Sequence, residues 1–113
     1  MEFLGTIAAS PGSPAIERRR WVDLIVGRQV GLAPVAPSSG INPFTRERTL
    51  FRANPATARV VIEGEDVGAM DWSQGEVGKI DVFGPAHLVV PVALDVAAAL
   101  GGVYRPWEGR RSN

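Results

Sequence analysis

Between residues 47 and 83 the chain alternates apolar and polar positions in four short runs, separated by clusters of Gly, Asn, Asp and Pro. Successive side chains of a strand point to opposite faces of a sheet, so this period of two predicts strands rather than helices. Turn residues that recur about every ten positions indicate an antiparallel meander. The predicted strands cover residues 47–53, 58–63, 67–73 and 79–83.

The pattern N-terminal to this region predicts one strand and one helix. A short apolar run over 3–8 ends at a Ser-Pro-Gly turn, which is typical of a strand. Ser13 and Pro14 then form a helix-start signal, because the Ser side chain can accept a free backbone amide and proline loses no hydrogen bond at the first helical position. We expect a helix over 14–26; a strand over 21–26 is the alternative, since a short apolar run fits both.

The C-terminal pattern predicts a short strand over 87–90 and a second helix over 91–100. Pro91 suits the first position of that helix, apolar side chains recur on one stripe, and a Gly-Gly pair ends it. The last residues, 106–113, are mostly polar, and we expect a frayed tail.

Together these elements predict an α+β fold with a mostly antiparallel, four- to five-stranded meander sheet and two helices packed on one face. A three-residue turn over 64–66 places Asp71 between Arg59 and Asp81 on neighbouring strands. A two-residue turn over 64–65 scatters the apolar side chains over both faces, so we prefer the longer turn. The predicted core face carries Thr49, Phe51, Val60, Ile62, Met70, Trp72, Ile80 and Val82.

The opposite face of the predicted sheet gathers the candidate binding residues. Asp71 and Asp81 could form an acid or metal pair, or they could be the acidic partners of cations on the adjacent strands. Mg²⁺ and Ca²⁺ prefer about six or more oxygen ligands, whereas this face offers arginines. We therefore favour ion pairing, and predict no metal site and no catalytic residue. The candidate binding residues are Arg48, Arg52, Arg59, Asp71 and Asp81.

The length of 113 residues, with 45% hydrophobic and 21% charged residues, fits a single domain over 1–113. Residues 31–43 are rich in Pro, Ser and Gly, which predicts a loop. A loop of this length in a small domain is either functional or mobile.

Charge and cysteine content exclude several classes of protein. Twelve basic and twelve acidic residues leave no net charge, so no overall field attracts nucleic acid or an anionic membrane. The absence of Cys excludes disulfides and thiolate chemistry. The first residues carry an acid at Glu2 and only a short apolar run, unlike a signal peptide or a membrane span. We expect a cytoplasmic protein that makes no membrane contact.

Few residues are suited to enzyme chemistry. His87 is the only histidine, which excludes a multi-histidine zinc site and makes any Ser-His-Asp arrangement depend on this residue, with Ser10 or Ser73 as nucleophile. The glycines between 64 and 78 match neither a phosphate-binding loop nor a dinucleotide fingerprint. We predict no cofactor, and keep a small enzyme that uses Asp71, Asp81 or His87 as the least favoured alternative.

Nucleic-acid binding through the arginine-bearing sheet face is a second alternative. Single-strand binders stack bases on exposed aromatic side chains, but the aromatic residues of the predicted sheet, Phe51 and Trp72, fall on the core face. The hexapeptide 42–47, Asn-Pro-Phe-Thr-Arg-Glu, resembles the N-P-x-T-G-E loop of bacterial histone-like HU proteins, which implies a DNA-bending β-arm. The resemblance covers six residues and has Arg46 where that loop has Gly, so we assign no family.

The favoured prediction is a non-catalytic protein-binding or self-associating module. It rests on the lack of catalytic motifs and on apolar residues in and beside the predicted loop, which exceed what a small core can hide. These residues are Val30, Leu32, Val35, Ile41 and Phe44.

Overall fold

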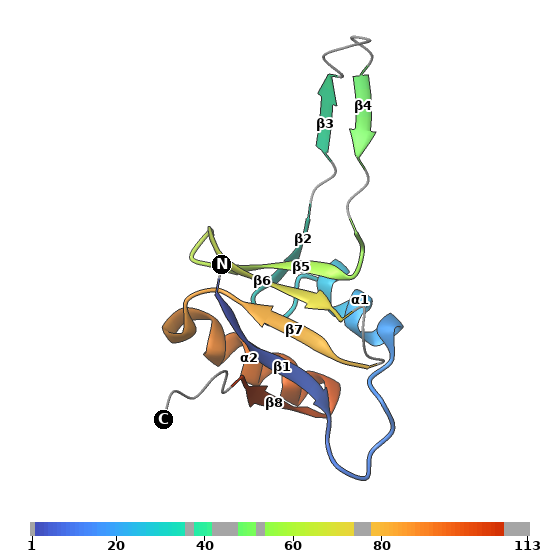
Figure 1. The fold of residues 1–113 in the computed structure, drawn as a ribbon, viewed down its shortest axis with the longest axis vertical. Coiled ribbons are helices and arrows are strands. Elements are labelled where there is room, and N and C mark those ends of the chain that lie inside the picture. Colours follow the sequence, from blue (N-terminus) through green and yellow to red (C-terminus); the bar gives the residue numbers. More distant parts are fainter. Residues whose placement is uncertain (1, 36–37, 42–47, 52–53, 74–77, 108–113) are drawn as a thin grey trace.

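Six strands form one sheet in the order β2-β5-β6-β7-β1-β8, and every neighbouring pair is antiparallel. The computed structural model describes residues 2–35, 38–41, 48–51, 54–73 and 78–107. The predicted α+β class is confirmed, with six strands in this sheet instead of four or five (Figure 1). Its strands are β1 (Phe3–Ala9), β2 (Leu32–Pro34), β5 (Thr57–Ile62), β6 (Glu65–Trp72), β7 (Ile80–Phe83) and β8 (Gly102–Pro106).

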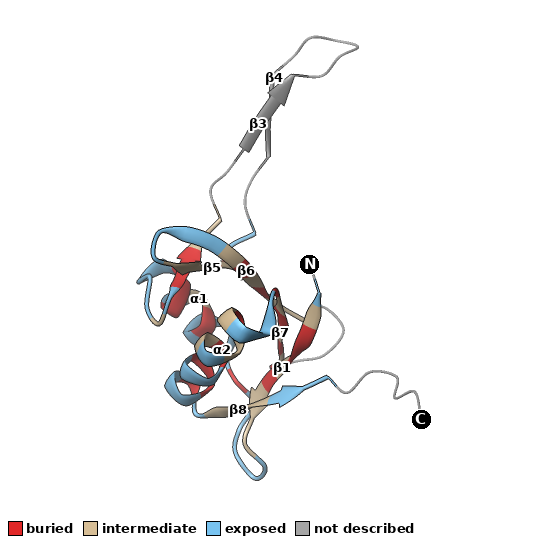
Figure 2. Cartoon of the chain, turned by 90° about the vertical axis from the view of Figure 1, so that its left-hand side faces the viewer, coloured by how far each residue is buried: buried red, intermediate tan, exposed pale blue. Residues whose placement is uncertain are grey.

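Two helices, α1 (Arg18–Val26) and α2 (Ala86–Leu100), lie on the same face of this sheet (Figure 2). The core lies between the helices and the sheet, so that buried side chains alternate with less buried ones along β5, β6 and β7. The largest fully buried side chains are Trp21, Ile7, Ile25, Met70, Ile80, Val60, Val82, Val89 and Val96.

Helix α1 begins at Arg18, four residues later than the predicted start at Pro14. The Ser13 amide donates instead to the carbonyl of Ser10 at 2.9 Å, so that Ser13 closes a turn. Ile16, in the segment between this turn and the helix, is buried in the core. The alternative of a strand over 21–26 is wrong, because Trp21, Leu24 and Ile25 form the buried stripe of the helix.

Helix α2 begins at Ala86, and it includes both the residues predicted as a strand over 87–90 and Pro91. A proline at this position removes a single hydrogen bond, to the carbonyl of His87, which lies in the exposed first turn of the helix. The apolar period continues through Pro91, so the predicted boundary between strand and helix at this residue is wrong. The predicted end is confirmed, since Gly101 adopts the left-handed conformation with φ 71°.

Strand β8 was not predicted, and it occupies the part of the chain just before the expected tail. It pairs with β1 at the edge of the sheet, with Thr6 opposite Arg105 and Ile7 opposite Tyr104. The Tyr104 hydroxyl donates to the carbonyl of Leu4 at 3.0 Å, and the Trp107 amide donates to the same carbonyl at 2.9 Å. The chain is therefore held to the sheet as far as Trp107, and residues 108–113 lie outside the described residues.

The turn between β5 and β6 differs from the predicted one. Glu63 and Gly64, with φ of 53° and 82°, form a two-residue turn, and the register then shifts at Val67, which has no partner in β5. This β-bulge moves the pairing by two positions from the predicted register, so the same side chains still face the core. Val60 and Met70 are fully buried as expected. Partner residues nevertheless change along the whole hairpin.

The segment predicted as a loop over 31–43 contains two strands. β2 pairs with β5 at the edge of the main sheet, whereas β3 (Ser38–Ile41) pairs with β4 (Arg48–Phe51) in a separate two-stranded sheet. This β3–β4 hairpin projects from the body of the molecule (Figure 1). The expectation that the strand over 47–53 joins the meander and places Thr49 and Phe51 on the core face is therefore wrong. The alternation of apolar and polar residues predicted the strand over 47–53, but it did not predict that this strand pairs with β3.

Within the described part of the chain, neither helix has the length and hydropathy that crossing a membrane requires.

Candidate functional site

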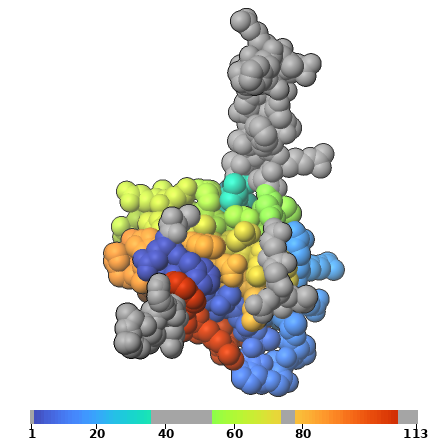
Figure 3. All heavy atoms as spheres, viewed as in Figure 1, coloured from blue at the N-terminus to red at the C-terminus, as the bar shows by residue number. Residues whose placement is uncertain are grey.

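The face of the six-stranded sheet that points away from the helices is the outer face, and no helix lies over it (Figures 1 and 3). Because alternate residues point to this face, the register brings polar side chains from five strands into one line across the sheet. This polar row consists of Thr57, Asp71, Asp81, Thr6 and Arg105.

Asp71 and Asp81 stand directly opposite each other on β6 and β7, as the sequence predicted. Like charges at opposed positions destabilise a sheet unless other groups compensate for them. One compensating group is Thr57, whose hydroxyl donates to an Asp71 carboxylate oxygen at 2.7 Å. Among the described residues, no three His, Asp or Glu side chains gather closely enough to hold a metal ion.

Arg59 does not pair with Asp71, which corrects the predicted arrangement of Asp71 between Arg59 and Asp81. The β-bulge places Arg59 opposite Ala69 and Thr57 opposite Asp71. The Arg59 guanidinium is 2.7 Å from the Asp66 carboxylate, and its Nε donates to the carbonyl of Pro34 at 3.0 Å. This exposed ion pair contributes at most about 1 kcal/mol, and it orients Arg59 along the β2 edge of the sheet.

The other two predicted binding residues cannot be joined to this group from the described part of the chain. Arg48 belongs to β4 of the projecting hairpin, where it pairs with Ile41, and Arg52 lies outside the described residues. The structure therefore brings together Arg59, Asp71 and Asp81 on one sheet face, and it separates Arg48 from them.

An aromatic row on the outer face was missed by the sequence analysis. The rings of Phe3 and Phe83 are 5.5 Å apart between centroids, and the rings of Phe3 and Trp107 are 5.6 Å apart in an edge-to-face arrangement. Both geometries are favourable for aromatic pairs. Trp107 remains 59% exposed. The alternation of Phe83 with the buried Val82 could have assigned Phe83 to this face, whereas Trp107 depends on the unpredicted strand β8.

Two of the apolar residues from which a binding surface was predicted belong to the core instead. Leu32 is 2% exposed in β2, and Val30 is partly buried and packs against the core. Val35 is half-buried, and Ile41 and Phe44 lie where side chains are not described. None of the described members of this group is an exposed apolar side chain, whereas Trp107 of the aromatic row is one.

The groups considered for nucleophilic chemistry lie apart. The Ser10 hydroxyl donates to the carbonyl of Gly101, just beyond the C-terminus of α2. His87 is exposed in the first turn of the same helix. A rise of 1.5 Å per residue separates these two positions by about 20 Å. Ser73 follows β6, and its amide donates to the carbonyl of Lys79.

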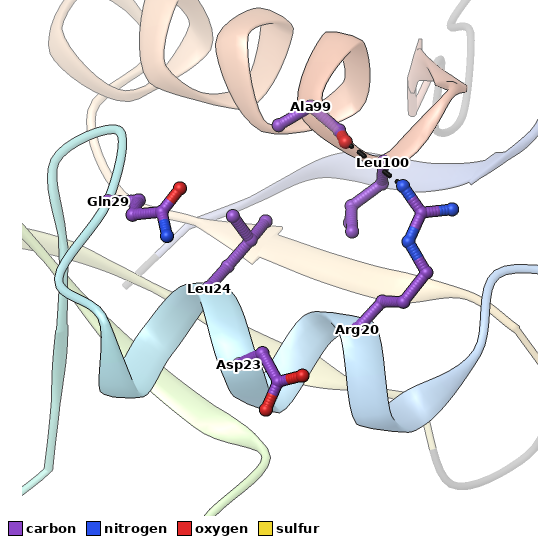
Figure 4. A pocket seen from close by; sticks show the side chains of 6 residues that line it. All are labelled: Arg20, Asp23, Leu24, Gln29, Ala99 and Leu100. Carbon is purple, nitrogen blue, oxygen red and sulfur yellow. Dashed lines mark hydrogen bonds between the residues drawn. The ribbon is translucent and has the colours of Figure 1, made fainter.

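A hollow of about 220 Å³ lies between α1, the residues that follow it and the C-terminal end of α2. Arg20 closes one side by donating to the carbonyl of Ala99 at 3.2 Å (Figure 4). The hollow is smaller than the pockets of about 300–1,000 Å³ that enclose drug-sized ligands, and it contains none of the predicted binding residues. Its lining residues are Arg20, Asp23, Leu24, Gln29, Ala99 and Leu100.

Comparison with known proteins gives no relative to place beside this geometry: no family model, curated protein or solved structure matches the chain.

Proposed function

We propose that this chain is a non-catalytic protein-binding module whose contact surface is the outer face of the sheet. The observation that supports the proposal is the aromatic row of Phe3, Phe83 and Trp107, which lies on a sheet face without a helix over it. Aromatic side chains, Trp above all, dominate the energetics of protein interfaces. An exposed apolar group rimmed by polar residues is typical of a protein contact site.

The polar row lies on the same face as the aromatic row and adds charged and hydroxyl groups to this surface. Arg105 is exposed at one end, and Thr6 and Thr57 supply hydroxyl groups beside the two aspartates. A protein partner that inserts an apolar side chain against Trp107 could place a cationic side chain near Asp71. Interfaces commonly combine such an apolar centre with a polar surround.

Truncation of the exposed indole tests the proposal. The Trp107→Ala chain, immobilised beside the wild type and an Arg19→Ala control, is exposed to lysate, and the retained proteins are compared quantitatively. We expect the specifically retained proteins to be lost from Trp107→Ala and kept by Arg19→Ala, because Arg19 is exposed on α1 away from the outer face. Equal retention by all three chains would refute the proposed surface.

The projecting hairpin favours a second candidate, nucleic-acid binding. A two-stranded β-ribbon fits the major groove of DNA, and this one carries Arg48 in β4. The chain segment between its strands is the hexapeptide 42–47. Binding of this kind is salt-dependent. A fluorescent duplex titrated at low ionic strength tests it, and an unchanged anisotropy would eliminate this candidate.

A further inference from the structure

Helix α2 is apolar except at two positions on its exposed side. Of its 15 residues, His87 and Asp95 alone carry a titratable side chain, and the rest are Ala, Val, Leu and Pro. Helices of this kind are normally buried on all sides. In this chain the described residues cover the side of α2 that faces the sheet, and Arg20 of α1 contacts its C-terminal end. The buried residues on that side are Val89, Ala93, Val96, Ala97 and Leu100.

The opposite side, the outer face of α2, is exposed and has a regular surface. At 100° per residue its side chains form two adjacent ridges with a spacing of four residues. Leu94, at the centre of one ridge, is 54% exposed. The ridges are Val90-Leu94-Ala98, of which Val90 is half-buried against the core, and His87-Pro91-Asp95, which is exposed at all three positions.

We propose that the outer face of α2 binds the same face of a second copy of this chain, with the two helices crossing in opposite directions about a twofold axis. Ridges spaced by four residues interdigitate at a crossing angle of about 50°, the commonest packing of helices in globular proteins. Ala98 and Pro91 carry no long side chain, so two such helices can approach closely. This contact is independent of the outer face of the sheet.

Charge complementarity identifies a second copy as the occupant. His87 and Asp95 lie four residues on either side of Pro91 along one ridge. A twofold axis near Pro91 therefore places His87 beside the partner's Asp95, and repeats the pair symmetrically on the other side. The imidazole can donate a hydrogen bond to the carboxylate whether or not it is protonated. Such a self-complementary patch is what a twofold interface requires.

Exchange of the two charged positions tests the pairing. Sedimentation velocity over a dilution series compares the wild type with His87→Asp, with the double variant His87→Asp/Asp95→His, and with Leu94→Glu. We expect a wild-type dimer. His87→Asp places two carboxylates together at both symmetric contacts, so the dimer dissociation constant should rise by about tenfold or more. The double variant should restore it, and Leu94→Glu should give monomers.

Unfolding is not the expected cause of dimer loss in His87→Asp, because an aspartate in the first turn of α2 interacts favourably with the helix dipole. Circular dichroism of each variant checks this. A wild-type chain that stays monomeric throughout the series overturns the proposal, as does a double variant that dissociates as readily as His87→Asp. If the wild type is a dimer that Trp107→Ala dissociates while Leu94→Glu does not, the α2 contact is refuted and the outer face of the sheet remains the contact surface.

Discussion

At the scale of single residues, Trp21 fills part of the core and also forms a hydrogen bond with the backbone of a distant segment. Its indole is fully buried, and its Nε1 donates to the carbonyl of Ala56 at 2.8 Å. Trp21→Phe removes this hydrogen bond and part of the buried volume. We expect the free energy of unfolding to fall by about 1–3 kcal/mol, measured by urea denaturation.

The matched control for this substitution is Trp107→Phe. Trp107 is 59% exposed, so loss of its indole nitrogen should change the free energy of unfolding by no more than about 0.5 kcal/mol. Equal destabilisation by the two substitutions would contradict the assignment of Trp21 to the core and Trp107 to the surface.

Tyr104 should cause the free energy of unfolding to fall at alkaline pH. Burial raises the pKa of its phenol from the ordinary value of 10.0. The native state therefore keeps the proton at a pH where the unfolded chain releases it. The contribution to stability is complete below pH 10 and is lost as pH rises through the pKa of the folded state. Denaturation at a series of alkaline pH values should show this fall, and Tyr104→Phe should reduce it.

The chain contains a single tyrosine, so absorbance of the phenolate reports Tyr104 alone. We expect its titration midpoint in the folded protein to lie above that in denaturant. Coinciding midpoints would show that burial does not perturb this group.

At the scale of elements, the β5–β6 hairpin depends on a turn in which both central residues have positive φ. Gly64 has φ 82°, and a Cβ added there would contact nothing within 4 Å. Gly64→Ala therefore tests backbone strain alone, and should lower the free energy of unfolding by about 1 kcal/mol. Glu63→Asn should raise it by about a few tenths of a kcal/mol, because Asn tolerates this conformation. Thermal denaturation of both variants provides the measurement, and a neutral Gly64→Ala would contradict the turn.

The period of the hydrophobic pattern predicted β1, β4, β5, β6 and β7 as strands and, for β5 to β7, which side of each strand faces the core. Val60, Met70, Ile80 and Val82 are buried together because alternation is a local property of the chain. Pairing is not local. The pattern of the strand over 47–53 fits a half-buried strand of any sheet, and nothing in it indicates that β4 pairs with β3 outside the main sheet.

The same difference between local alternation and non-local pairing explains which parts of the candidate site could be predicted. The pairing of Asp71 with Asp81 was predictable because β6 and β7 pair without a register shift. Arg59 was assigned the wrong neighbour because a bulge at Val67 shifts the hairpin by two positions. The aromatic row required Trp107 to be held by the edge strand β8, which is five residues long and begins with glycine.

At the scale of the whole molecule, the β3–β4 hairpin is separable from the six-stranded domain. Its strands pair with each other and with no strand of the main sheet. Replacing residues 36–53 by a short Gly-Ser linker should therefore leave the free energy of unfolding within about 0.5 kcal/mol of the wild type, since loop-closure entropy changes slowly with length. Denaturant unfolding of the shortened chain measures this difference. A large loss of stability would show that the hairpin supports the core.

The shortened chain also separates the two candidate functions. If the outer face of the sheet binds a protein partner, the shortened chain should retain that partner while Trp107→Ala loses it. If the hairpin binds DNA, the shortened chain should lose salt-dependent binding to a duplex while Trp107→Ala keeps it. Because the hairpin projects from the body and Trp107 lies against Phe3 at the other edge of the sheet, neither change alters the other surface.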